Sequence, residues 1–150
     1  GTMCGSLANA DPSSEWCLVA ATLDAEFTAL SSRGRRVIQA AEWFQGLMTT
    51  ALQSDELLMQ VRFPLLGEGT LFGFQEFSRR AGDFAPAMAL VTFRVESGLI
   101  ADPQLGCVGG EAHPPRAAAG GGRTSVHGGG VAGWRLASRL SERFGRLRRF

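Results

Sequence analysis

The sequence predicts an α+β fold in which one helix accompanies about six mainly antiparallel strands. Apolar residues recur at helical spacing in only one early segment, residues 13–23. Several later segments alternate apolar and polar residues, as half-buried strands do. Residues 87–95 are almost continuously apolar, and Gly98 turns the chain back towards residues 99–108. With 150 residues, the chain is long enough to bury a hydrophobic core.

The predicted helix follows a polar turn. Asp11 is a good N-cap residue, Pro12 suits the first helical position, and Glu15 places a carboxylate where the helix dipole favours it. The apolar face that we expect to be buried is formed by Trp16, Val19, Ala20 and Leu23, with Cys17 beside it.

The strands follow in order along the chain. Residues 24–31 and 35–40 are predicted to form a hairpin around a tight turn at 31–34, and residues 41–44 a short helical turn. Residues 57–63 alternate strictly, so Leu57, Met59, Val61 and Phe63 should share one face and Leu58 the other; Pro64 ends this strand. Residues 72–77 form another strand.

The first hairpin turn carries Arg33, Arg35 and Arg36. A cluster of arginines is compatible with nucleic-acid binding, but charged side chains at a hairpin turn are more often simply exposed to solvent. We therefore interpret it as a solvated hairpin tip.

The first residues, Thr2-Met3-Cys4-Gly5-Ser6, combine glycine with hydroxyl side chains just before the predicted helix. Glycine permits a positive φ and a close backbone approach, so such a turn can direct N–H groups at a phosphate. A plain loop has the same composition. The residues alone leave both readings open.

Charge divides the chain into two parts. The net charge of +1 combines −6 over residues 1–111 with +7 over residues 112–150, and every fixed positive side chain is arginine. Residues 117–150 are rich in Gly and Arg, which predicts a disordered tail or a non-native, shifted-frame segment. Within it, residues 134–147 have the pattern of a basic amphipathic helix for a membrane surface or nucleic acid, but we favour the interpretation that this pattern is accidental. His113 and His127 have no partner at ligand spacing and are interpreted as loop residues.

Cysteine usage and hydropathy exclude several classes of protein. Cys4, Cys17 and Cys107 are widely spaced and odd in number, which argues against a disulfide framework or an iron–sulfur site and favours a reducing cytoplasm. No apolar run approaches about 18 residues, so no membrane span is expected.

Three stretches in order resemble one protein family. Residues 1–15, Gly-Thr-Met-Cys-Gly-Ser-Leu-Ala-Asn-Ala-Asp-Pro-Ser-Ser-Glu, are similar to the second FAD-binding motif of the flavoprotein subunit of molybdenum hydroxylases, the group of aerobic carbon monoxide dehydrogenase and xanthine dehydrogenase. Residues 55–64 resemble its DELL-x-x-V-x-x-P strand. Residues 77–85 resemble its Arg-Arg-x-x-Asp-Phe-Ala segment.

The resemblance implies a fragment of an FAD-dependent oxidoreductase subunit. Residues 1–66 would be the C-terminal part of a PCMH-type FAD-binding domain, and residues 67–116 the beginning of the flavoprotein C-terminal domain. Electrons would pass from an iron–sulfur partner through FAD to an acceptor. The molybdenum cofactor and 2Fe-2S clusters would lie in the large and small subunits. The alternative is a truncated remnant without cofactor or activity.

The resemblance also implies cofactor-binding positions and no catalytic side chain. Thr2, Met3, Cys4, Gly5 and Ser6 would surround the FAD pyrophosphate, with Asn9 near the same groups. Glu15 would contact the cofactor, for example through its ribose, or simply be a first-turn charge. The Leu58 backbone would meet the isoalloxazine edge, and Gln75 stands where many relatives have Lys. The segment containing Arg79, Arg80 and Asp83 would lie near the ring or form a turn salt bridge. Cys4 replaces a family glycine, so a positive φ there would be strained.

Overall fold

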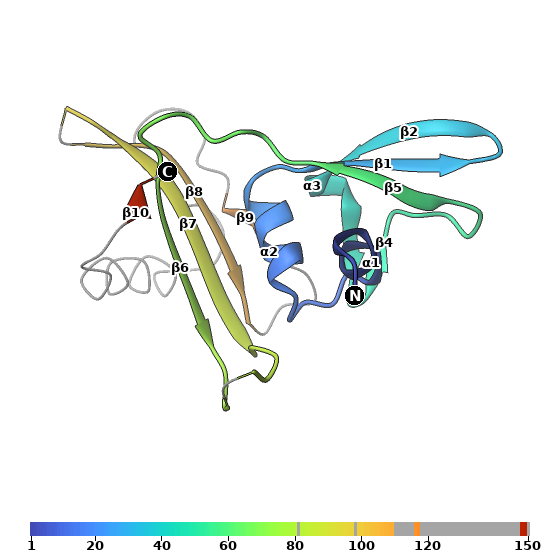
Figure 1. Cartoon of the computed structure of the whole chain (residues 1–150), viewed down its shortest axis with the longest axis horizontal. Helices are drawn as coiled ribbons and strands as arrows, with labels where there is room; N and C mark the ends of the chain where they lie inside the picture. Colours follow the sequence, from blue (N-terminus) through green and yellow to red (C-terminus); the bar gives the residue numbers. More distant parts are fainter. Residues whose placement is uncertain (81, 98, 110–115, 118–147, 150) are drawn as a thin grey trace.

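The computed structural model describes residues 1–80, 82–97, 99–109, 116–117 and 148–149. It contains two larger antiparallel sheets with one helix, α2, between them (Figure 1). The α+β class, with helix and mainly antiparallel strands, is confirmed. The elements are α1 (Met3–Asn9), α2 (Glu15–Thr22), β1 (Glu26–Ser31), β2 (Gly34–Gln39), α3 (Ala40–Trp43), β3 (Phe44–Gly46), β4 (Thr49–Thr50), β5 (Leu57–Arg62), β6 (Leu71–Phe77), β7 (Ala87–Glu96), β8 (Leu99–Val108), β9 (Arg116–Ala117) and β10 (Arg148–Arg149).

The first sheet has the order β2-β1-β5. β1 and β2 form the predicted hairpin, in register from Glu26 opposite Gln39 to Ser31 opposite Gly34. Gly34 has φ +128°, a conformation that side chains rarely adopt, so glycine suits this turn. The small β3–β4 hairpin was not predicted.

The strict alternation predicted for residues 57–63 is wrong, because β5 contains a bulge. Leu58 pairs with Ala29 but Gln60 pairs with Thr28, so Met59 is the extra residue. The bulge reverses the side-chain alternation after Leu58. Leu58, Val61 and Phe63 therefore pack against the core, while Leu57 and Met59 are exposed.

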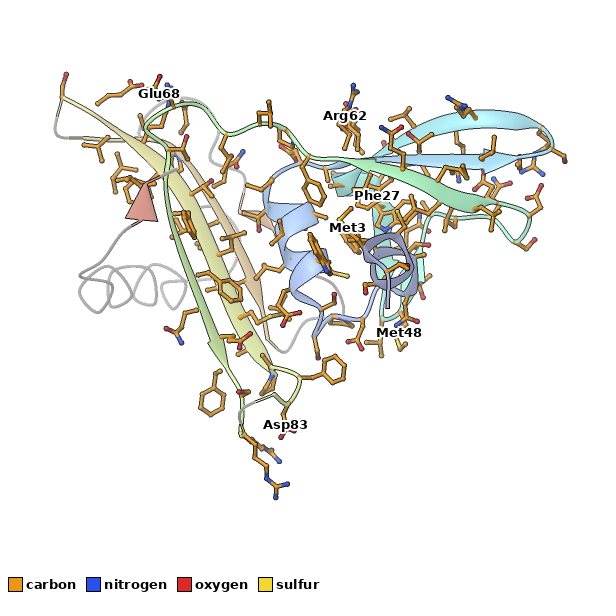
Figure 2. All side chains as sticks on the ribbon, viewed as in Figure 1. Met3, Phe27, Met48, Arg62, Glu68 and Asp83 are labelled. Atoms are coloured by element: carbon orange, nitrogen blue, oxygen red, sulfur yellow. The ribbon has the colours of Figure 1, made fainter. Side chains whose placement is uncertain are left out.

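The core under the first sheet is centred on two stacked aromatic rings. The Phe27 and Trp43 rings lie parallel with centroids 4.2 Å apart, and both side chains are fully buried. Trp43 Nε1 donates a hydrogen bond of 3.1 Å to the carbonyl of Leu7 in α1. Figure 2 labels Phe27, which lies between the sheet and α1. The stack and the hydrogen bond thus fix α1 beneath the sheet.

The predicted boundaries and buried face of α2 need correction. Its N-cap is Ser14, not Asp11, and the Asp11 side chain instead accepts a 2.8 Å bond from the Ser13 N–H in the preceding turn. Trp16, which was expected in the core, is 45% exposed and packs beside Phe63.

α2 is buried on two sides. Cys17, Ala20 and Ala21 belong to the core of the first sheet, whereas Leu18 belongs to a second core with residues of β7 and β8. An amphipathic pattern has one apolar face, so it could not predict a helix covered by a sheet on each side. Figure 1 shows this placement, with α2 between the long strands and the first sheet.

Gly106 in β8 lets α2 approach the second sheet closely. A Cβ at this position would lie 1.9 Å from Thr22 Oγ1 and 2.9 Å from Leu18 Cδ1. Thr22 is fully buried, and its hydroxyl donates a 2.7 Å bond to the Leu18 carbonyl one turn back. The contact therefore requires glycine for space, since no side chain fits there.

The second sheet has the order β10-β6-β7-β8-β9. The predicted antiparallel pair of residues 87–95 and 99–108 is confirmed as β7 and β8, with a bulge after Thr92. Arg148 pairs with Phe72 in β6. His113, His127 and residues 134–147 lie outside the described residues, as does nearly all of the predicted tail.

Candidate functional site

The first residues form the helix α1 in place of the expected turn. Thr2 is the N-cap of α1, and its Oγ1 accepts a 3.1 Å hydrogen bond from the Gly5 N–H. A Cβ on Gly5 would come within 2.8 Å of that oxygen. The close approach of the capping side chain thus explains why position 5 is a glycine. A positive φ does not, because Gly5 is not among the residues with one.

The start of α1 presents two free amide groups. In a helix the first N–H groups have no intrahelical acceptor. Thr2 satisfies the N–H of Gly5, and the N–H groups of Met3 and Cys4 have no acceptor among the described residues. No acidic residue lies in the first turn. The expected strain at Cys4 is absent, because Cys4 is helical and is not among the residues with positive φ.

Ser6 and Asn9 occupy different parts of α1. The Ser6 carbonyl accepts the N–H of Ala10 at 3.1 Å and faces the Cys17 thiol at 3.9 Å, while its side chain is half-buried. Asn9 is exposed in the last helical position. A seven-residue helix is about 10 Å long, so Asn9 lies nearly that far from the two free amides.

Two further predicted positions lie on elements that contact α1. α1 packs against β5 and against α2. Leu58 sits in β5 directly before the bulge and is half-buried. Glu15 is the exposed first residue of α2. The fold therefore brings together the elements that carry these residues.

Gln75 lies on the second sheet. It is exposed in β6 opposite Ala89, and its Nε2 donates a 2.9 Å bond to the Glu76 carbonyl.

The turn after β6 is closed by the Asp83 N–H, which donates to the Arg80 carbonyl at 3.2 Å. Figure 2 shows Asp83 at the tip of this turn. Among the described residues, no ion pair joins Asp83 to Arg79 or Arg80, so the turn salt bridge is not formed.

Sequence reasoning missed an ion pair between β2 and the start of β5. Arg36 Nε and Nη2 donate to Glu56 Oε1 and Oε2, both at 2.7 Å. Glu56 Oε2 also accepts the Gln53 N–H at 2.8 Å, and Arg36 Nη2 donates to the Ala51 carbonyl at 2.6 Å. We call this set the Arg36–Glu56 clamp. The Arg36 guanidinium, and after it the Gln53 N–H, lowers the pKa of Glu56 to about 2.

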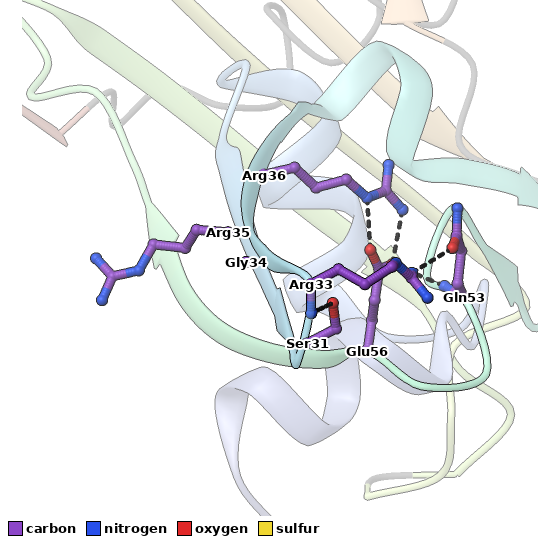
Figure 3. A pocket seen from close by; sticks show the side chains of 7 residues that line it. All are labelled: Ser31, Arg33, Gly34, Arg35, Arg36, Gln53 and Glu56. Atoms are coloured by element: carbon purple, nitrogen blue, oxygen red, sulfur yellow. Dashed lines mark hydrogen bonds and ion pairs between the residues drawn. The ribbon is translucent and has the colours of Figure 1, made fainter.

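A pocket opens between the first hairpin and residues 53–56 (Figure 3). Ser31, Arg33, Gly34, Arg35, Arg36, Gln53 and Glu56 line it. Arg33 pairs with Asp55 and Gln53, and Arg36 with Glu56, whereas Arg35 points away from them. Arg33 and Arg35 are exposed at the hairpin tip, as expected, but acidic residues 20 or more positions later pair with Arg33 and Arg36, which the sequence did not predict.

Other kinds of site find no support in the described part of the chain. No group of three or more His, Cys, Asp or Glu residues there could hold a metal ion. No described helix has the length and hydropathy needed to span a membrane. Burial raises the pKa of the Cys17 thiol to about 11, so it is a core residue and not a nucleophile.

Comparison with known proteins agrees with the resemblance. Residues 1–66 match the model of the FAD binding domain in molybdopterin dehydrogenase. The chain is 41% identical over 97 residues to caffeine dehydrogenase subunit beta of Pseudomonas sp. strain CBB1. This match covers 64% of the chain and 33% of that protein. It is 38% identical over 110 residues to the nicotine 6-hydroxylase medium subunit of Paenarthrobacter nicotinovorans, covering 73% of the chain and 38% of that subunit.

Solved structures show the same fold. Quinoline 2-oxidoreductase of Pseudomonas putida 86 superposes with a TM-score of 0.76 and 27% identity, covering 99% of this chain and 51% of that one. Carbon monoxide dehydrogenase of Hydrogenophaga pseudoflava gives a TM-score of 0.75 and 27% identity, with coverage of 79% and 42%. The chain thus spans between a third and about half of the relatives that it matches. Residues 1–66 belong to the FAD-binding domain family of molybdopterin dehydrogenases, and the chain is a homologue of molybdenum hydroxylase medium subunits.

Proposed function

We propose that the chain binds FAD with the start of α1 at the pyrophosphate and β5 beside the flavin ring. The observation that carries this proposal is the pair of free N–H groups on Met3 and Cys4, within the segment that matches the FAD-binding family. Backbone donors at a helix start bind phosphate oxygens, and the helix dipole adds to the attraction.

The residues present fit a diphosphate. The first turn of α1 has no carboxylate to repel it, and the Thr2 hydroxyl can donate a hydrogen bond while its oxygen caps Gly5. Cys4 keeps the helical conformation, so its side chain does not distort the backbone. In this proposal Ser6, Asn9 and Glu15 add polar contacts, and Leu58 offers its backbone to the ring.

The wider role that we propose is electron transfer within a larger enzyme. FAD, when bound, exchanges electrons with a donor and an acceptor, and the protein holds and orients it. Relatives described as medium subunits or chains support partnership with a large molybdenum-containing subunit and a small iron–sulfur subunit. Gln75 lies on the second sheet and not beside α1 or β5, so in this proposal it would approach the flavin only in the complete subunit.

A substitution at Met3 tests the backbone donor directly. Proline is favoured at the first helical position, and the extended Thr2 backbone (φ −122°, ψ 153°) accepts a following proline. Met3→Pro should thus keep α1 while deleting one N–H. Because a hydrogen bond to a charged group contributes about 1.5–3 kcal/mol, we expect FAD affinity to fall roughly 10- to 100-fold.

The matched control is Met3→Ala, which removes the side chain and keeps the N–H. FAD binding is measured by flavin fluorescence titration, and by the visible flavin band that remains after desalting. Equal affinities for the two variants would contradict a role for this amide. A colourless wild-type chain that leaves flavin fluorescence unchanged would contradict FAD binding by the chain. It would favour the alternative that the chain is a truncated remnant without cofactor.

A further inference from the structure

The Arg36–Glu56 clamp joins three segments at one carboxylate. Arg36 comes from β2, Ala51 and Gln53 from the connection after β4, and Glu56 from the residue before β5. The Glu56 side chain is only 4% exposed. Both of its oxygens accept charge-assisted or backbone hydrogen bonds, so the carboxylate has a single well-determined position.

The clamp lies next to the irregular part of β5. Leu58 is two residues after Glu56 and is the last residue before the bulge at Met59. A bulge leaves one residue unpaired and disrupts the ladder locally, so other contacts beside it help to fix the strand. With β1 in the middle of the sheet, Arg36 on β2 reaches across to the far strand and fixes the start of β5.

The position of β5 also affects α1. α1 packs directly against β5, and Trp43 also holds α1 through a hydrogen bond to the Leu7 carbonyl. A shift in β5 would therefore change the spacing between the Leu58 backbone and the free amides of Met3 and Cys4.

We infer that Arg36 and Glu56 are positioning residues for the proposed FAD site, which hold the β5 bulge at a fixed distance from the start of α1. This inference rests on the proposed function, although neither residue is assigned to contact the cofactor. Sites that depend on exact placement need such support from residues behind the contacting groups.

The chain contains a matched control for this inference. Arg33 also connects the first hairpin to residues 53–55, through Asp55 and Gln53, but its side chain is 58% exposed and that of Asp55 is 42% exposed. The test uses the full chain with Arg36→Lys, Glu56→Gln, the double variant and Arg33→Gln. Arg36→Lys keeps the charge but loses the two-pronged geometry.

We expect about tenfold weaker FAD binding for Arg36→Lys and Glu56→Gln, and less than about twofold for Arg33→Gln. The double variant should bind about as weakly as either single one, because the pair acts as a unit. At saturating FAD, the circular dichroism of the visible flavin band should change in the clamp variants. General loss of stability would lower the folded fraction without altering the spectrum of bound flavin.

Amide hydrogen exchange gives a reading that does not need FAD. The clamp variants should speed exchange at residues 57–60 relative to Phe27 and Ile38, and Arg33→Gln should not. Unchanged exchange at 57–60, or unchanged affinity with an unchanged flavin spectrum, would overturn the inference. If the wild type binds no FAD while the clamp variants still speed exchange, the proposed function fails for this chain and the structural role of the clamp stands.

Discussion

The two sheets are held in different ways. Beneath β2-β1-β5 lies a core of fully buried side chains, with the Phe27–Trp43 stack at its centre and ion pairs across the sheet. The described core of the second sheet is smaller, although Arg94 pairs with Asp102 across β7 and β8, and α2 packs against it at Gly106, where there is no room for a side chain. The first region is thus stabilised mainly by its own side chains, whereas the second depends on a helix that both regions share.

The largest effect is expected from Phe27→Ala. The substitution removes a fully buried ring, its stacking with Trp43 and its edge contact with Phe44, at a cost of about 3–5 kcal/mol in the free energy of unfolding. Denaturant unfolding measures it. Phe74→Ala, at a partly buried position in the second region, is the matched comparison and should cost less. Equal losses would remove the distinction between the two cores.

A smaller effect is expected from Gly106→Ala. The added methyl group would overlap Thr22 and Leu18, and overpacking of this kind costs about 1–3 kcal/mol. Hydrogen exchange should accelerate in β7 and β8 more than in β1. Gly67→Ala is the control, because nothing lies within 4 Å of a Cβ there. Thr22→Ala in the Gly106→Ala background should restore part of the loss, and no recovery would argue against a steric cause.

The smallest effect concerns the acid sensitivity that the Arg36–Glu56 clamp of the first region should add. Glu56 has a pKa of about 2 in the folded chain against an ordinary 4.5, so the unfolded state binds a proton more readily. Its stabilising contribution is complete above about pH 4.5 and is lost as the pH falls to about 2. Between these values, the denaturation midpoint of the wild type should fall more than that of Glu56→Gln. Parallel curves would show that the clamp adds no pH dependence.

Local patterns in the sequence predicted most elements of the fold. Alternation and turn residues located the first hairpin, and the apolar run around Gly98 located β7 and β8. The resemblance of the first residues, and of those before Pro64, correctly indicated the family of residues 1–66. These signals are short-range, so one sequence suffices to see them.

The parts that were missed depend on contacts between distant segments. The β5 bulge arises from pairing with β1, and alternation within residues 57–63 contains no sign of it. Burial of α2 on two sides requires Gly106, more than 80 positions later. The role of Gly5 is an exception, because it depends on where the side chain of Thr2, only three residues away, lies. The cofactor contacts of Asn9, Glu15 and Gln75 remain predictions.

The placement of α2 also determines how the chain responds to being cut. Cleavage in the exposed stretch around Leu65 would place the two sheets on separate pieces of the chain. Leu18 and Thr22, on the first piece, would still pack against Gly106 on the second. The two pieces should therefore remain together as a noncovalent complex. Removing the first 23 residues instead would leave both sheets without their shared cover and expose apolar surface on each.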